Sequence, residues 1–255
     1  MKKKPTPANL PDSKQTTKRI YRQLVKTRLK ATRVIVQETD LCIYADRDVS
    51  TSAKEAVIRQ RGYIENYMRR HPDFAPSLNP LPMDDLAPKI VKDMMDAGRK
   101  AQVGPMAAVA GAVAERVARI LRADADQIII ENGGDLFADA SQDITIAVYA
   151  ADSPLSLRIG LKISADLMPL AACTSSGTVG HSLSKGRADA VCVLSRSCPL
   201  ADAAATAIGN RVLTTEDIDP AIQWGRTIDG VMGILVVIGE KMGAWGRIEL
   251  VSLDL

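Results

Sequence analysis

The chain has 255 residues, of which 46% are hydrophobic, so it can form one large domain, or two small ones, with a sizeable core. Residues 1–33 carry eleven Lys and Arg against one acid, whereas the remaining 222 residues sum to a charge of −7. The basic side chains thus gather in a terminal segment rather than on a folded face, which argues against a nucleic-acid-binding protein.

The four cysteines contain no CxxC pair, which argues against a disulfide framework and for a reducing compartment. No stretch reaches the roughly 18 apolar residues that span a bilayer. The N-terminus has lysines but no apolar signal segment. We therefore expect a soluble, cytoplasmic protein with no membrane partner.

The first residues are rich in Lys, Pro, Thr and Ser. They predict a disordered basic tail over residues 1–18, followed by one globular domain over residues 19–255. Two strands are expected next, near residues 21–37 and 41–44.

A capping-box pattern, Ser52-x-x-Glu55, predicts the start of a helix that ends near Arg70, before His71-Pro72. Prolines then mark residues 74–88 as a loop of the kind that crosses a surface or covers a site.

Two more helices are expected, over residues 88–100 and 106–122. Gly104 precedes the second, so its N-terminal N–H groups either face a ligand phosphate or belong to a helix packed tightly through small residues. Tight packing is the simpler interpretation.

The second half reads as strands joined by turns. A buried strand at 128–130 runs into Asn132-Gly133-Gly134-Asp135, which is first of all a hairpin turn. The glycines also let a backbone approach a ligand, and Asp135 could order water or metal. Further strands are expected, in chain order, at residues 144–148, 155–163, 190–194, 232–238 and 245–253, the last two joined by a hairpin at 239–243, with a short helix at 219–225. The pattern predicts an α+β fold with a mainly antiparallel sheet.

A hydroxyl-rich loop is expected over residues 173–178, with His181 just beyond it. A helix over residues 199–210 follows, in which Asp202 and Thr206 lie one turn apart on the same face. A carboxylate and a hydroxyl so placed can bind Mg²⁺. The competing interpretation is an ordinary turn, followed by an alanine-rich helix packed on a sheet with Asp and Thr at its surface.

These motifs resemble, in order and spacing, those of the ApbE-like superfamily. The matching phrases are ENGGD (residues 131–135), CTSSGTVGHS (173–182) and ADAAATAIGN (201–210). Together with VGPMAAVAGA (103–112), they are typical of a shorter, uncharacterised ApbE-like family of bacteria and archaea.

The superfamily's studied members are FAD:protein FMN transferases that use Mg²⁺ to attach FMN to a Thr of a target protein. The resemblance implies Mg²⁺ at Asp202 and Thr206, and an acid/base role for His181. It also implies a cleft for FAD or another nucleotide-like ligand, lined by Asn132, Gly133, Gly134, Asp135, Thr174, Ser175, Ser176, Gly177 and Thr178. A small-molecule ligand and a protein substrate or partner follow from it, and homo-oligomerisation is left open.

The chain departs from the transferases at His181, where Ser182-Leu183-Ser184-Lys185 replaces their Ile-Ile-Asp-Pro. An alternative is therefore an accessory or sulfur-transfer protein of homocysteine metabolism that has lost flavin transfer. There Cys173 would react as a thiolate, with its pKa lowered by a positive neighbour such as His181. The competing interpretation of Cys173 is a small buried hydrophobe. We further expect Gly133 and Gly177 to lie where a side chain would intrude on backbone or ligand.

Overall fold

The computed structural model describes residues 29–177 and 186–253. The predicted tail over residues 1–18 and the candidate site residues Thr178 and His181 lie outside this range. The helices are α2 (Ser50–Arg70), α3 (Lys89–Ala101), α4 (Val109–Leu121), α5 (Cys198–Gly209) and α6 (Ile218–Gly225), with 3-10 turns at Pro105–Ala108, Ala165–Leu167 and Thr215–Asp217. The strands are β1 (Lys30–Val36), β2 (Thr39–Ala45), β3 (Ile128–Asn132), β4 (Asp135–Asp139), β5 (Ile144–Ala147), β6 (Ile159–Ile163), β7 (Leu170–Ser175), β8 (Ala190–Ser195), β9 (Val231–Ile238), β10 (Lys241–Gly246) and β11 (Glu249–Ser252).

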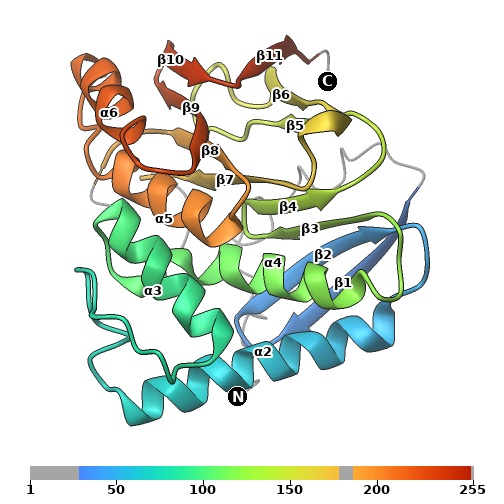
Figure 1. The fold of residues 1–255 in the computed structure, drawn as a ribbon. Coiled ribbons are helices and arrows are strands. Elements are labelled where there is room, and N and C mark those ends of the chain that lie inside the picture. Colours follow the sequence, from blue (N-terminus) through green and yellow to red (C-terminus); the bar gives the residue numbers. More distant parts are fainter. Residues whose placement is uncertain (1–28, 178–185, 254–255) are drawn as a thin grey trace, which may run out of the picture.

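The strands form two antiparallel sheets. The large sheet has eight strands in the order β1-β2-β3-β4-β7-β8-β9-β10, and the small sheet has three in the order β11-β6-β5. Figure 1 shows helices α2 to α5 stacked along one face of the large sheet. The small sheet packs on the opposite face, over β7 to β9. The antiparallel α+β fold expected from the sequence is confirmed.

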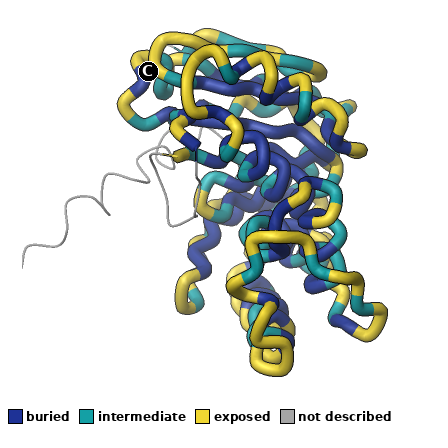
Figure 2. The backbone as a smooth tube through the Cα atoms, turned by 90° about the vertical axis from the view of Figure 1, so that its left-hand side faces the viewer, coloured by how far each residue is buried: buried dark blue, intermediate teal, exposed yellow. Residues whose placement is uncertain are grey.

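Strand β7 shows why the centre of the large sheet is apolar on both faces. Ala171 and Cys173 belong to the core beneath the helices, whereas Leu170 and Ala172 belong to the core shared with the small sheet. Successive side chains of a strand point to opposite faces, so a strand between two layers is buried throughout. Figure 2 shows the same distribution, with buried residues along the central strands and exposed residues in the loops at the periphery.

The predicted helices are present, but the capping box is not. Helix α2 begins at Ser50, whose N–H donates to the Asp48 side chain at 2.9 Å, and the Ser52 hydroxyl donates instead to the Val49 carbonyl. The predicted end at Arg70 is confirmed. Helix α5 begins at Cys198, and the Ser197 hydroxyl accepts the N–H of Leu200 as its N-cap.

Two predicted strands are shorter than expected, for a backbone reason. Residues 155–158 form a turn, in which Leu157 has a φ of +59°, and only Ile159–Ile163 is strand. The predicted strand 245–253 is divided at Gly246, whose φ is +79° and where a Cβ would lie 2.3 Å from the Met232 carbonyl oxygen. The chain there leaves the large sheet as β10 and enters the small sheet as β11. The preceding hairpin is also tighter than predicted. Lys241 already pairs with Ile238, so the chain turns at Gly239-Glu240 rather than over residues 239–243.

No helix in the described parts of the chain is both long and apolar enough to cross a membrane.

Candidate functional site

The β3–β4 hairpin forms one wall of the candidate site, and its predicted turn is confirmed. Asn132 and Asp135 pair across the turn, with Gly133 and Gly134 between them at φ values of +69° and +109°. The Asn132 side-chain amide donates to the Ala110 carbonyl at 3.0 Å, which ties the turn to the start of α4. The expectation of steric intrusion at Gly133 is wrong for the described protein atoms, because a Cβ there would meet nothing within 4 Å. Its positive φ alone favours glycine.

Asp135 lies opposite Cys173 in the β4–β7 register, and both residues are buried. Burial raises the pKa of Asp135 well above its ordinary value, and the negative charge of Asp202 raises it further. The contact with Cys173 acts in the other direction on this pKa. Two carboxyl groups from distant parts of the sequence thus lie close enough to affect each other's ionisation.

Asp202 lies where the N-termini of α4 and α5 meet. Its Oδ2 accepts the N–H of Gly111 at 2.9 Å. A Cβ on Gly111 would lie 2.4 Å from the Cys198 carbonyl oxygen and 3.0 Å from the Cβ of Asp202, so the two helices touch through this glycine. Although Asp202 is only half-buried, burial of its carboxyl group raises the pKa to about 7, against the opposing effect of the Gly111 and Ala110 N–H groups.

Thr206 lies one helical turn beyond Asp202 and is also half-buried, as expected for two residues on the same face of α5. Among the residues that the structure describes, no group of three or more His, Cys, Asp or Glu side chains could hold a metal ion. The donor chemistry of Asp202, Thr206 and Asp135 still fits Mg²⁺, because this ion takes one or two carboxylates and completes its shell with water and substrate phosphate. A cation would also lower the free-energy cost of ionising Asp135 and Asp202 close to each other.

The end of β7 forms the next part of the site, and here one expectation is wrong. Residues 173–175 are strand rather than loop. Thr174 contacts the Cys192 Sγ at 3.1 Å, on the face of the sheet away from α5. Ser175 is on the same face as Cys173, beneath the helices.

Ser175 and Gly177 show what this segment can offer a ligand. Ser175 is 8% exposed, and its hydroxyl has no hydrogen-bond partner among the residues that the structure describes. Buried polar groups are nearly always paired, so this hydroxyl is a candidate ligand contact. Ser176 and Gly177 follow the strand, and a Cβ on Gly177 would lie 2.1 Å from the Gly186 carbonyl oxygen. The expected close backbone approach is therefore confirmed at Gly177.

Cys173 does not have the environment that a reactive thiolate needs. Its Sγ lies 3.5 Å from the Cys198 Sγ, and both residues are fully buried. Burial raises the pKa of the Cys173 thiol well above its ordinary value, and the contact with Cys198 and the charges of Asp135 and Asp202 raise it further. The expected lowering of this pKa is wrong.

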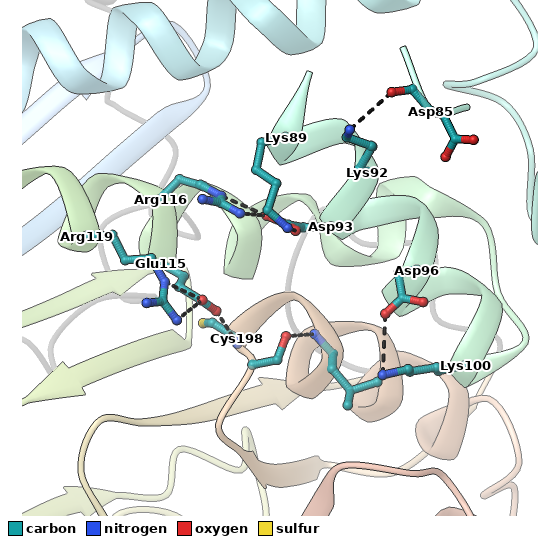
Figure 3. Close-up of polar contacts among 12 residues, drawn as sticks. Asp85, Lys89, Lys92, Asp93, Asp96, Lys100, Glu115, Arg116, Arg119 and Cys198 are labelled. Atoms are coloured by element: carbon teal, nitrogen blue, oxygen red, sulfur yellow. Dashed lines mark hydrogen bonds and ion pairs between the residues drawn. The ribbon is translucent and has the colours of Figure 1, made fainter. Parts of the chain in front are cut away.

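Gly111 and Glu115 lie one turn apart on α4, and neither was predicted from the sequence as a site residue. Glu115 is 8% exposed, and Figure 3 shows its carboxylate between Cys198 and Arg119. Its Oε2 accepts the N–H of Cys198 at 2.7 Å, and its Oε1 accepts from Arg119 at 2.8 Å. The signal in the sequence is an acid on the same helix face as the buried residues Gly111, Ala112 and Ala118.

Comparison with known proteins agrees with this fold. A family model described as AbpE bacteria matches residues 22–242. A UPF0280 protein of Methanococcus maripaludis is 41% identical over 228 residues, which cover 87% of this chain and 92% of that protein. A UPF0280 protein of Methanocaldococcus jannaschii is 40% identical over 229 residues, with 87% and 93% covered.

Two solved structures share the fold at low sequence identity. The flavin transferase ApbE from Vibrio cholerae has a TM-score of 0.54 at 12% identity and covers 86% of this chain and 97% of its own. The apo flavinyl transferase ApbE of Pseudomonas stutzeri has a TM-score of 0.53 at 13% identity, with 86% and 94% covered. The expected ApbE-like relationship is confirmed, and the chain belongs to the family described as AbpE bacteria.

Proposed function

We propose that this protein binds a phosphate-bearing nucleotide, with FAD as the first candidate, together with Mg²⁺, and acts as a transferase of the flavin-transferase type. The observation that carries the proposal is Asp202 at the meeting point of two helix N-termini, with Asp135 beside it. Helix N-termini favour anionic groups, and paired carboxylates favour a divalent cation. Mg²⁺ and a nucleotide pyrophosphate together supply both.

Each described residue of the site has a defined part in this proposal. Asp202 and Thr206 would hold the cation, which would neutralise pyrophosphate charge when bound. The Ser175 hydroxyl would donate to the ligand, since it is a buried polar group that has no partner within residues 29–177 and 186–253. The backbone at Gly133 and Gly134 would border the ligand, as the turn has no side chains there.

His181 stays a proposed acid/base group outside the described residues. In that role it would accept the proton of an acceptor hydroxyl on a protein substrate. Sulfur transfer through Cys173 is not supported by its burial and raised pKa.

Calorimetric titration of FAD, FMN and ADP, each with and without Mg²⁺, tests the proposal. We expect at least one of them to bind more tightly with Mg²⁺. Asp202→Asn should abolish this coupling, because it keeps the shape and removes the charge, whereas Thr206→Val should weaken it less, because a neutral ligand is lost. Asp93→Asn is the matched control, since Asp93 is a partly buried acid that pairs with Arg116 rather than with the residues of the candidate site. Coupling that survives in Asp202→Asn would overturn the metal assignment, and no nucleotide binding under any condition would overturn the function.

A further inference from the structure

We propose that Glu115 is a positioning residue for Asp202, an inference that rests on the proposed function of the site. Glu115 belongs to α4 and contacts neither Asp202 nor the ligand turn at β3–β4 in the hydrogen bonds of the described residues. It acts through the first residue of α5. The carboxylate accepts the Cys198 N–H at 2.7 Å, and Asp202 lies one helical turn further along α5.

The two helices exchange reciprocal bonds. Glu115 on α4 accepts the N–H of Cys198 on α5, and Asp202 on α5 accepts the N–H of Gly111 on α4. On α4, Glu115 lies four residues after Gly111, and on α5, Asp202 lies four residues after Cys198. The helices are therefore joined at two points, one turn apart, with Gly111 in contact with Cys198 between them. A rigid helix cannot shift at one point without shifting at the other.

Glu115 needs both of its oxygen atoms as acceptors. Oε1 accepts from the Arg119 guanidinium and Oε2 from a backbone N–H, and neither of these donors can accept a hydrogen bond. In Glu115→Gln, one oxygen is replaced by an NH₂ group that faces a donor. This near-isosteric variant should therefore release either Arg119 or Cys198. Glu115→Asp keeps both acceptors on a shorter side chain and should restore part of the function.

The first test measures how strongly Mg²⁺ tightens ADP binding in calorimetry. We expect Glu115→Gln to weaken this coupling about 10- to 100-fold, as for other residues that orient a metal ligand. ADP binding without Mg²⁺ should change much less, and Glu115→Asp should recover part of the coupling. Asp93→Asn is the control, because it breaks an ion pair with Arg116 of the same helix, and the described residues of α5 form no hydrogen bond with Asp93. Unchanged coupling in Glu115→Gln would overturn the inference.

A second measurement needs no ligand, so it separates this inference from the proposed function. Amide hydrogen exchange followed by NMR should show faster exchange at both Cys198 and Gly111 in Glu115→Gln, because Asp202 moves with α5. Asp93→Asn should leave both rates near those of the wild type. Faster exchange at Cys198 alone would mean that Glu115 acts only locally and would overturn the positioning role. If wild-type protein shows no Mg²⁺ coupling, the proposed function fails, while this exchange result still decides whether Glu115 places Asp202.

Discussion

Asp135 of β4 and Cys173 of β7 are direct register partners at the centre of the large sheet, on the face that α5 covers. The carboxyl and the thiol share a buried environment with Cys198, whose Sγ is 3.5 Å from that of Cys173. Burial and neighbouring negative charge disfavour ionisation of each group. The Asp135 carboxyl and the Cys173 thiol are therefore favoured in their protonated forms, and this part of the site offers no thiolate nucleophile.

The first prediction concerns thiol reactivity. All four cysteines are buried, and burial raises the pKa of Cys192 and of Cys198 to about 11. We expect no rapid reaction of the native protein with a disulfide reagent such as DTNB at pH 8, because the thiolate is the reacting form. In guanidinium chloride all four thiols should react. Rapid labelling of Cys173 in native protein, located by mass spectrometry, would revive the sulfur-transfer hypothesis.

Local chemistry in the sequence predicted some elements well. The Asn132–Asp135 hairpin was predictable because two residues with positive φ between apolar strands demand glycine. Gly246 divides the last strand for a reason that no local pattern contains. Its neighbours alternate like a continuous strand, but the chain changes sheets there, and the Met232 carbonyl leaves no room for a Cβ.

The candidate site could be predicted only where its residues lie close together in the sequence. Asp202 and Thr206 follow from spacing on one helix. The approach of Asp135 to Asp202, and the bond from Glu115 to Cys198, join segments more than 60 residues apart, so only the tertiary structure brings them together. The capping box at Ser52 failed differently, because α2 begins two residues earlier, at Ser50, whose N–H donates to the Asp48 side chain.

The second prediction uses two helical glycines with opposite surroundings. Gly111→Ala places a Cβ 2.4 Å from the Cys198 carbonyl oxygen, so α4 and α5 must separate. We expect a loss of about 1–3 kcal/mol in the free energy of unfolding, the usual cost of overpacking. Gly62→Ala on α2 meets nothing within 4 Å and should gain about 0.5–1 kcal/mol through helix propensity. Urea denaturation measures both, and equal effects would contradict the close helix contact.

The third prediction separates the two loop glycines. At Gly133 the φ of +69° is the only obstacle to a side chain, so Gly133→Ala should cost about 1 kcal/mol and Gly133→Asn less. Gly177→Ala should cost more than Gly133→Ala, because its Cβ would lie 2.1 Å from a backbone oxygen. Thermal unfolding of the three variants tests this order. Equal melting temperatures for Gly177→Ala and wild type would mean that the segment adjusts freely.

The fourth prediction concerns the pH dependence of stability. Burial raises the pKa of Asp202 to about 7 in the folded protein, from an ordinary value of 3.8. Between these two values the folded state keeps the proton and the unfolded state loses it, so the folded state binds more protons. The contribution of Asp202 to stability is therefore fully present below pH 4 and is lost as pH rises towards 7. One proton limits the slope to about 1.4 kcal/mol per pH unit.

Urea denaturation of wild type and Asp202→Asn from pH 4 to pH 8 isolates this contribution. The wild-type free energy of unfolding, minus that of the variant, reports on Asp202 because Asn cannot titrate. This difference should fall steadily up to about pH 7 and then level off, because Asp202 is then ionised in both the folded and the unfolded state. Asp135 contributes to the same transition through its coupling with Asp202, which can broaden the decline but not reverse its sign. A difference that instead rises between pH 4 and pH 7 would show that Asp202 is stabilised as the carboxylate in the free protein, so that the cation site would be charged before any ligand arrives.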